Sequence, residues 1–390
     1  MKKNTGLILL TFIFISFIGL LASCKKNIYT GAMATSDSSF QNWRFIGEQI
    51  LPTDFMFQST PVGGLSGIDF NPLTNQYYVI SDDRSELAPA RFYTFKLHFT
   101  ANSFDSVKIN GVSYLRQPNG NLYPSKNQDK TNVPDPESIR YVNATNTLLW
   151  TSEGDRKIDE DDTLLINPWL RETKTDGNYL SDLPIPENYN MQKKELGMRQ
   201  NGSVESLALT PDEQFIYIVN EEPLFQDGPP ADFNETESYV RITKIKRTTK
   251  EILAQYAYKL DKVHAAPLNP NGFKINGVAE LLAISENKLY VMERSFAIGA
   301  TPSNSIRVFE VDLQNATNVI NMPSLANAQF KPVAKQLVYN LSKLKSEVDN
   351  VEGICFGPNL PNGNKTILLV SDNNFSTIQK TQFLVFELIK

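Results

Sequence analysis

The sequence predicts an all-β protein, a β-propeller with five blades of four antiparallel strands each. Three observations predict this fold. One apolar motif recurs five times at nearly constant spacing, and a second strand-like segment follows each copy after a turn. The chain also ends on what reads as a third strand, while a lone strand-like segment precedes the first repeat.

The first element of each repeat is an apolar segment with an oxygen-bearing side chain near its start. The segments are 64–70, 136–142, 203–209, 278–284 and 351–357, and the matched residues are Ser66, Glu137, Glu205, Glu280 and Glu352. The separations between matched residues are 71, 68, 75 and 72, so one unit has roughly 70 residues.

The second elements are rich in β-branched and aromatic residues, follow turn-forming residues and end in acids or amides, which is typical of strands. They span 77–83, 148–155, 216–222, 289–295 and 367–374. Third strands are expected at 91–99, 238–247, 305–313 and 382–389, and the clearest fourth strands at 252–260 and 335–341. Each unit is therefore a four-stranded meander.

Four-stranded units that repeat along the chain bury their faces by radial arrangement, which is the propeller solution. Pairing of the first strand, 43–51, with the last, 382–389, would complete the final blade and leave no free edge. The second unit is unclear beyond its hairpin, so a sixth blade within 101–135 or 162–202 remains an alternative.

The first residues predict export. Lys2 and Lys3 precede an apolar run, and the junction Leu21–Cys24 resembles a bacterial lipobox, so residues 1–23 are expected to be a lipoprotein signal peptide and Cys24 the lipidated residue. Residues 24–42 are expected to be a flexible tether and 43–390 the propeller. We therefore expect the protein in the cell envelope of a bacterium, where its lipid would anchor it to the outer membrane.

Composition narrows the class of function. The chain has 390 residues, a net charge of -5 and 21% charged residues, so it shows no basic bias for nucleic acid. The second cysteine, Cys355, lies in an apolar segment, which indicates a core residue and no structural disulfide. We expect a monomer.

Antiparallel pairing brings the start of each first strand and the end of each second strand to one edge of the blade. The matched residues should therefore meet at one mouth of the channel, surrounded by acids that end the second strands: Asp82, Asp83, Glu153, Asp155, Glu221, Glu222, Glu293 and Asp372. At about 5 Å, two such carboxylates repel by about 3 kcal/mol at an effective dielectric constant of 20. A ring of carboxylates with one hydroxyl suits Ca²⁺.

The segments GGLSGIDF, VPDPESIRY, NGSVESLALTPD, LYVMERSF and VEGICFGP resemble the phytase-like domain family, described as having esterase-like activity of phytase. The resemblance covers roughly 63–388 and implies a propeller and a calcium-dependent phosphoesterase. A weaker similarity, through VEGICF and the Ser66 position, is to calcium-activated apyrases, five-bladed propellers with a central calcium.

A phosphate-ester substrate, implied by this resemblance, assigns roles to residues near the acids. Asp83 or Glu222 would orient or deprotonate a water, and Arg84, Arg156 and Arg294 would bind phosphate. The same arginines could instead form salt bridges with neighbouring acids. An acidic rim argues against phytate itself as the substrate.

Two functions are therefore expected from the sequence. The first is an exported, lipid-anchored, calcium-dependent hydrolase of a small-molecule phosphate ester. The second is a non-catalytic binding or scaffold propeller whose calcium is structural, because fold does not imply function.

Overall fold

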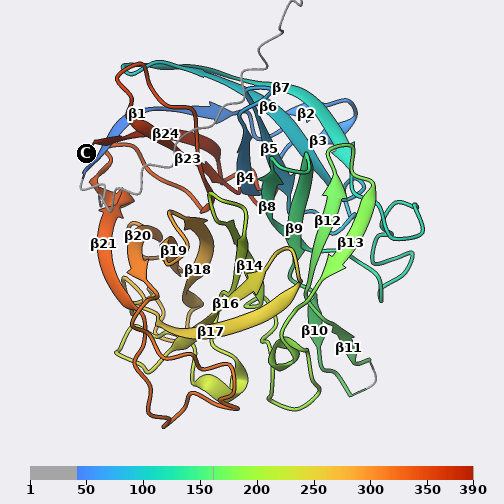
Figure 1. Cartoon of the computed structure of the whole chain (residues 1–390), viewed down its shortest axis with the longest axis vertical. Coiled ribbons are helices and arrows are strands. Elements are labelled where there is room, and N and C mark those ends of the chain that lie inside the picture. The colour runs from blue at the N-terminus through green and yellow to red at the C-terminus, as the bar shows by residue number, and fades with distance from the viewer. Residues whose placement is uncertain (1–41, 161, 390) are drawn as a thin grey trace, which may run out of the picture. The chain divides into compact units, whose positions relative to one another are not determined.

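Every copy of the repeat folds into one four-stranded antiparallel sheet, and the five sheets stand around a common axis (Figure 1). The computed structural model describes residues 42–160 and 162–389. Within these ranges it contains five propeller blades, almost no helix, and no sixth blade. The prediction of a five-bladed all-β propeller is confirmed, and the six-bladed alternative is wrong.

Blades 1 to 5 are numbered by their innermost strands. These are β4 (Leu65–Asn71), β8 (Pro136–Val142), β14 (Val204–Leu209), β18 (Lys274–Ala283) and β22 (Val351–Phe356). The second strands are β5 (Gln76–Ser81), β9 (Thr147–Ser152), β15 (Phe215–Asn220), β19 (Lys288–Ala297) and β23 (Lys365–Ser371). Both sets are largely buried, which is why they read as continuous apolar runs.

The third strands are β6 (Arg91–Phe99), β12 (Trp169–Lys174), β16 (Tyr239–Lys246), β20 (Asn304–Asp312) and β24 (Thr381–Ile389). The outer strands are β7 (Phe104–Tyr114), β13 (Tyr179–Leu183), β17 (Glu251–Lys259), β21 (Ala334–Asn340) and β1 (Asn42–Leu51). The regions considered for a sixth blade thus supply the outer strand of blade 1 and both outer strands of blade 2.

A few short elements lie between these strands. They are the hairpins β2 (Met56–Phe57) with β3 (Thr60–Pro61) and β10 (Asp155–Lys157) with β11 (Leu164–Ile166), and the single 3₁₀ turns η1 (Glu187–Tyr189), η2 (Phe225–Asp227) and η3 (Leu341–Lys343). The β10–β11 hairpin is inserted between the second and third strands of blade 2.

The hydrophobic core is divided into layers between neighbouring blades. Five clusters of buried side chains each join residues of two consecutive blades, including one between blades 5 and 1. Burial of apolar area between blades therefore stabilises the ring as a whole, because no blade covers both of its faces alone.

The ring is closed by the two ends of the chain. Strand β1 pairs antiparallel with β24, from Asn42 opposite Ile389 to Leu51 opposite Thr381, with one bulge. The predicted closure is confirmed. Trp43 fixes this seam, because its ring stacks on Tyr339 and contacts Tyr290 and Phe386, at centroid distances of 5.5–5.6 Å.

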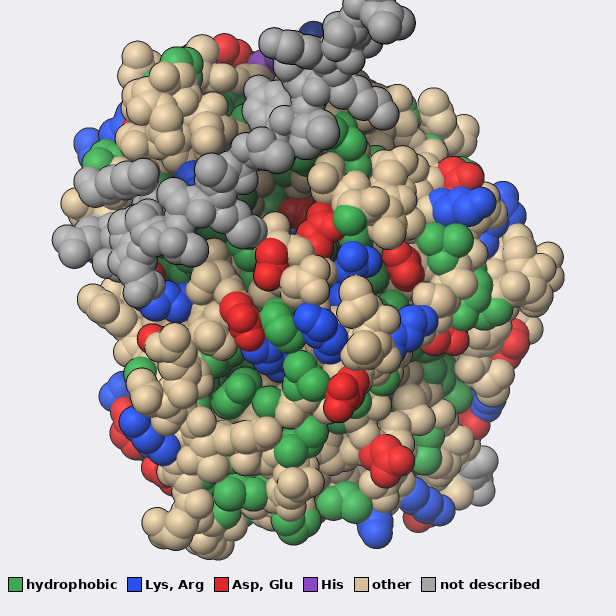
Figure 2. Space-filling model, in the orientation of Figure 1, with side chains coloured by type: hydrophobic (Ala, Val, Ile, Leu, Met, Phe, Trp, Pro, Cys, Tyr) green, Lys and Arg blue, Asp and Glu red, His purple; other side chains and the backbone are tan. Residues whose placement is uncertain are grey.

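Figure 2 shows acidic and basic side chains intermixed on the face that it presents. The predicted signal peptide, the predicted lipidation site Cys24 and the predicted tether up to residue 41 lie outside the described residues. In the part of the chain that the structure covers, no helix has the length and apolar character needed to cross a membrane.

The seam makes a testable prediction. Replacing Trp43 by alanine removes a buried aromatic side chain and its three ring contacts, so we expect the free energy of unfolding to fall by about 3–5 kcal/mol. Urea unfolding followed by tryptophan-independent far-ultraviolet circular dichroism measures it. A loss no larger than that of the half-exposed control Leu337→Ala would contradict a closing role for this strand pair.

Candidate metal centre at the propeller mouth

Each inner strand carries a β-bulge near its start, and the bulge decides which side chain reaches the axis. In β4, β14 and β22 the residue skipped by the pairing with the second strand is Ser66, Glu205 and Glu352, respectively. In β8 the skipped pair begins with Glu137. A bulge leaves the extra residue unpaired and re-aims its side chain, so four repeats present an oxygen ligand at equivalent places.

Blade 4 departs from this pattern. Pairing in β18 skips Ala279, so Glu280 stands one residue beyond the position that the sequence comparison assigned to it. The Glu280 side chain is buried: its carboxylate accepts hydrogen bonds from Ser138 Oγ at 2.6 Å and Leu207 N at 2.9 Å and pairs with Arg140 at 2.9 Å. The prediction that Glu280 joins the other matched residues is therefore not supported by its position.

Arg140 and Glu280 fill the centre of the propeller. The Arg140 guanidinium donates to the carbonyl oxygens of Ile68 in blade 1 and Leu281 in blade 4, both within 2.8 Å. Burial raises the pKa of Glu280 to about 7, although Arg140 opposes the shift. This pair ties inner strands together across the axis, which makes it part of the scaffold.

A second set of acids directly follows the second strands. In blades 1, 2, 3 and 5, the residue before the bulge pairs with the last residue of the second strand. The next residue along the chain is an acid in each case: Asp82, Glu153, Glu221 and Asp372. Blade 4 again differs, since Arg294 holds the equivalent position. The blade thus replaces both of its expected acids, one by alanine and one by a cation.

These acids form one group, the mouth cluster, completed by Asp135 at the start of blade 2. Its members are Asp82, Asp135, Glu137, Glu153, Glu205, Glu221, Glu352 and Asp372. Two sets of carboxylate oxygens lie within 4.8 Å of one another, Asp82 with Asp135 and Glu137, and Glu137 with Glu153 and Glu205. Glu137 belongs to both.

Burial and mutual repulsion change the protonation of the cluster. Burial is the largest cause that raises the pKa of Glu137 well above its usual value, and Asp82, Glu205, Asp135 and Glu153 raise it further. The pKa values of Asp82, Glu153, Glu205 and Asp372 are raised well above normal in the same way. The pKa of Glu221 reaches about 7 despite the opposing charge of Arg294.

Two of the three predicted phosphate-binding arginines lie at this cluster. Arg84 holds Asp135 through two contacts, one of them from Nε to Oδ1 at 2.7 Å, and lies 3.8 Å from Glu153. Arg294 donates to Glu221 at 2.7 Å and to Asn350 at 3.1 Å. Eight carboxyl groups thus face two guanidinium groups, and the cluster keeps a large excess of acid.

Arg156 lies elsewhere. It donates to the backbone carbonyls of Gln192 and Lys193, and its guanidinium stacks on Phe225, 4.6 Å from the ring centroid. Its contacts hold the loop between blades 2 and 3 in place, and no contact joins it to the mouth cluster among the described residues.

Of the two predicted catalytic acids, Asp83 lies outside the mouth cluster and Glu222 lies at its edge. Both oxygens of Asp83 are occupied, by the backbone N–H groups of Glu86, Leu87 and Ala88 and by the buried Arg91 at 2.6 Å. Asp83 therefore shapes a loop, and its neighbour Asp82 enters the cluster in its place. Glu222 is half-buried beside Glu221, and burial raises its pKa.

Ser66 lies at the predicted position, but its hydroxyl donates to the backbone carbonyl of Glu137 at 2.6 Å, which ties blade 1 to blade 2. Asp135 was missed by the sequence comparison. In the sequence, Asp135 stands two residues before Glu137 in VPDPES, and this position is not part of the repeated pattern.

The mouth cluster passes a simple test for calcium. Calcium binds oxygen at about 2.3–2.6 Å, so two ligands on opposite sides of one ion lie about 5 Å apart. Oxygen sets that lie within 4.8 Å of one another match this spacing, and hard carboxylates are the preferred ligands. Of the two sets, the one formed by Glu137, Glu153 and Glu205 is better placed to hold an ion, since Asp135 of the other set is already held by Arg84.

No curated protein matches the chain. Among solved structures, the propeller is similar to the α-L-arabinofuranosidase of Lactobacillus brevis, with 9% identity, a TM-score of 0.44, and 87% of this chain and 94% of that chain covered. It is also similar to the hydrazine synthase of Kuenenia stuttgartiensis, with 10% identity, a TM-score of 0.34, and 84% and 98% covered.

The family comparison is decisive. The model of the phytase-like family, described as "Esterase-like activity of phytase", matches residues 60–375, which include all five inner strands and every member of the mouth cluster. This chain therefore belongs to the phytase-like family.

Proposed function

We propose that this phytase-like propeller is a calcium-dependent hydrolase of phosphoric esters whose reaction takes place at the mouth cluster. The observation that carries the proposal is the excess of buried carboxylates, two sets of which share Glu137 at spacings that suit one divalent ion each. Like charges at this density need protons or cations, and a calcium ion supplies the charge.

Glu137, Glu153 and Glu205 would hold the ion. When bound, the ion would draw charge from the phosphoryl oxygens and so favour attack at phosphorus. Arg294 pairs with Glu221 at 2.7 Å and its buried Nε lies 3.6 Å from Glu352, so its charge would stabilise negative charge that develops at the cluster.

Glu222 is the proposed proton acceptor. It is half-buried at the edge of the cluster, so it can contact water, and its raised pKa makes it a stronger base than an ordinary glutamate. The attacking water forms a bond to phosphorus and gives its proton to Glu222. The ester P–O bond then breaks, and the alcohol leaves with a proton from solvent.

A second candidate function is a binding or scaffold propeller with a structural calcium. It is favoured by the ion pairs of Arg84 and Arg294, which leave few cationic groups free for substrate. The two functions differ in one result. Both predict that calcium stabilises the protein, but only the hydrolase turns over a phosphate ester.

Lipid attachment, envelope localisation and a monomeric state are further proposals. The first two rest on the lipobox-like Leu21–Cys24 and on the charge pattern of the first residues. Because Cys355 is buried, metabolic labelling with palmitate that is lost in Cys24→Ser would support lipidation. Equal labelling of parent and variant would contradict it.

Removal of a cluster glutamate tests the hydrolase directly. Glu205→Gln removes one charge from the centre of the cluster, so we expect calcium affinity to fall on the order of 10–100-fold and chelator-sensitive hydrolysis of 4-nitrophenyl phosphate to fall with it. Glu251→Gln, at an exposed site on β17, is the matched control. If no phosphate ester is turned over with or without chelator, the hydrolase proposal is wrong.

The base has its own test. Glu222→Gln keeps the shape of the side chain but cannot accept a proton, so kcat should fall by about 100–10,000-fold while calcium affinity changes little. Steady-state kinetics and calcium titration are measured on the same sample. An unchanged kcat would remove Glu222 from the reaction.

The raised pKa values make the metal-free protein sensitive to pH. A carboxyl group whose pKa is raised by folding stabilises the fold while it is protonated, and this stability is lost as pH rises through the folded pKa. With Glu221 at about 7 and its neighbours raised, the melting temperature in chelator should fall between pH 5 and pH 8.

Added calcium should restore this loss at pH 8 and have little effect at pH 5, where protons already neutralise the cluster. Thermal melts at both pH values, with calcium and with chelator, provide the measurement. A calcium-induced shift that is equal at the two pH values would contradict the assignment of the ion to these carboxyl groups.

A further inference from the structure

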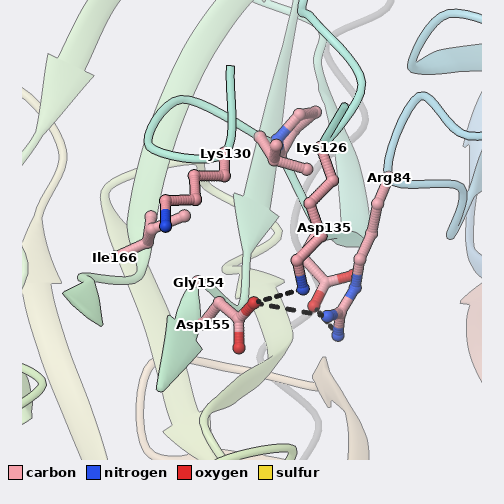
Figure 3. A pocket seen from close by; sticks show the side chains of 9 residues that line it. Arg84, Lys126, Lys130, Asp135, Gly154, Asp155 and Ile166 are labelled. Carbon is pink, nitrogen blue, oxygen red and sulfur yellow. Dashed lines mark hydrogen bonds and ion pairs between the residues drawn. The ribbon is translucent and has the colours of Figure 1, made fainter. Parts of the chain in front are cut away.

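The two sides of the propeller mouth differ in the side chains that they offer. On the side of blade 2, charged side chains pair with one another, and Figure 3 shows Arg84 and Lys126 converging on Asp155. On the side of blade 4, Arg294 bounds the mouth cluster, and the surface beyond it carries exposed apolar side chains. The apolar side is therefore the one that is open to an uncharged group.

An extension of the blade 4 hairpin carries this apolar surface. Strand β18 begins at Lys274, four residues before Val278, the residue that precedes its bulge. Beyond the pair Gly277–Arg294, β18 and β19 continue for three more residue pairs, about 10 Å at roughly 3.3 Å per residue. The other four inner strands begin directly at the residue before the bulge: Leu65, Pro136, Val204 and Val351.

Strand alternation divides the side chains of this extension between two faces. Successive residues of a strand alternate in direction, and directly opposite residues of an antiparallel pair share a face. One face carries Arg294 at its base and then Phe296 and Ile298, with Ile275 and Phe273 opposite them. We call Phe273, Ile275, Phe296 and Ile298 the apolar stripe.

The other face of the extension is polar and covered. Asn276 donates to Glu293 at 2.8 Å, and the hydroxyl of Ser295 accepts a hydrogen bond from the backbone N–H of His264 at 3.0 Å. The loop that bears His264 thus packs on the polar face and leaves the apolar one open. Folded proteins usually cover apolar faces, so an exposed stripe indicates a contact surface.

The apolar stripe is continuous and largely open to solvent. Phe273 is 62% exposed and Ile298 is 49% exposed, and the rings of Phe273 and Phe296 lie 6.0 Å apart. The N–H of Ile298 donates to the carbonyl of Phe273 at 3.0 Å, which fixes the two residues side by side. Leu268, 83% exposed, lies against Gly299 and adds to the apolar tip.

We infer that the apolar stripe binds the organic group of the phosphate ester, so that the preferred substrate is an ester of an apolar alcohol, above all an aromatic one. The inference rests on the proposed hydrolase function and deepens it, because it names the substrate class. The stripe starts at Arg294 on the same face, so the substituent of a phosphoryl group held at the cluster can lie along it. Phe273 and Phe296 offer ring contacts to an aromatic group, and burial of apolar area favours the complex.

Charge favours a small organic group over a membrane as the occupant of the stripe. A lipid surface resting on the blade 4 tip would face the carboxyl groups of the mouth cluster, which repel anionic headgroups. An extension of about 10 Å also suits one ring and a short linker better than a bilayer surface.

Substrate discrimination tests the inference. Phenylethyl phosphate and ethyl phosphate are both esters of primary alcohols and differ by the aromatic ring. In Phe273→Ala/Ile298→Ala, the ratio of kcat/KM for the phenylethyl ester to that for the ethyl ester should fall at least about tenfold, whereas Phe273→Leu/Ile298→Leu should keep most of it.

The matched control is Leu73→Ala/Leu337→Ala. It removes two apolar side chains that are 70% and 48% exposed, in the β4–β5 turn and on the outer strand β21, and should leave the ratio unchanged. Circular dichroism and melting temperature show whether all variants fold.

A binding measurement separates this result from the hydrolase proposal. Phenylethylphosphonate and ethylphosphonate have a P–C bond in place of the ester bond, so they are not hydrolysed. In calcium, calorimetric titration should show that the parent binds the phenylethyl compound at least about tenfold more tightly, and that Phe273→Ala/Ile298→Ala loses this preference.

Each outcome decides one of the two proposals. Absence of turnover of any phosphate ester, with a phosphonate preference that depends on Phe273 and Ile298, would refute the hydrolase and retain the apolar subsite. An unchanged kcat/KM ratio, or a phosphonate preference that is equal in parent and double variant or absent from both, would overturn the subsite. Binding to phosphatidylglycerol vesicles, or dimerisation, that is lost in the double variant while the ratio stays unchanged would assign the stripe to a lipid surface or a second copy instead.

Discussion

Repulsion between buried carboxyl groups is the constraint on which the proposed chemistry of this propeller depends. Eight acids of the mouth cluster face two arginines, and burial raises the pKa of most of them. A fold that only needed stability would not concentrate like charges at the one point where its five inner strands meet. Under the proposed function, a divalent cation would share those charges and would supply what a phosphoester reaction needs.

The scaffold produces this concentration by a simple device. In a blade, the bulge at the start of the inner strand brings one side chain to the axis, and the end of the second strand brings another. The repeat places such a pair of side chains on successive blades of the ring. Blade 4 breaks the symmetry with Ala279 and Arg294, while Glu280 turns inward to Arg140. The cluster is therefore one-sided, with acids on blades 1, 2, 3 and 5 and a cation on blade 4.

Sequence spacing predicted the blades, their closure and the convergence of Glu137, Glu205 and Glu352, because burial on both faces leaves a clear apolar pattern. It placed Glu280 wrongly because it matched glutamate with glutamate, whereas the bulge residue of blade 4 is Ala279. In the other four blades an apolar residue is followed by Glu or Ser, then by Gly or Ser, and then by another apolar residue. In VAEL of blade 4, Glu280 stands at the third of these positions, where the other blades have Gly or Ser. Asp83 and Arg156 could not be distinguished from Asp82 and Arg84 by spacing, since their partners come from loops with no repeat.

The most direct test of the central claim is a crystal structure grown with calcium, with a second crystal soaked in a lanthanide to give strong anomalous scattering. We expect an anomalous peak bounded by Glu137, Glu153 and Glu205, at about 2.3–2.6 Å from their oxygens. A structure in which Glu137, Glu153 and Glu205 bond only to protein groups, with the ion absent or bound elsewhere, would contradict this site.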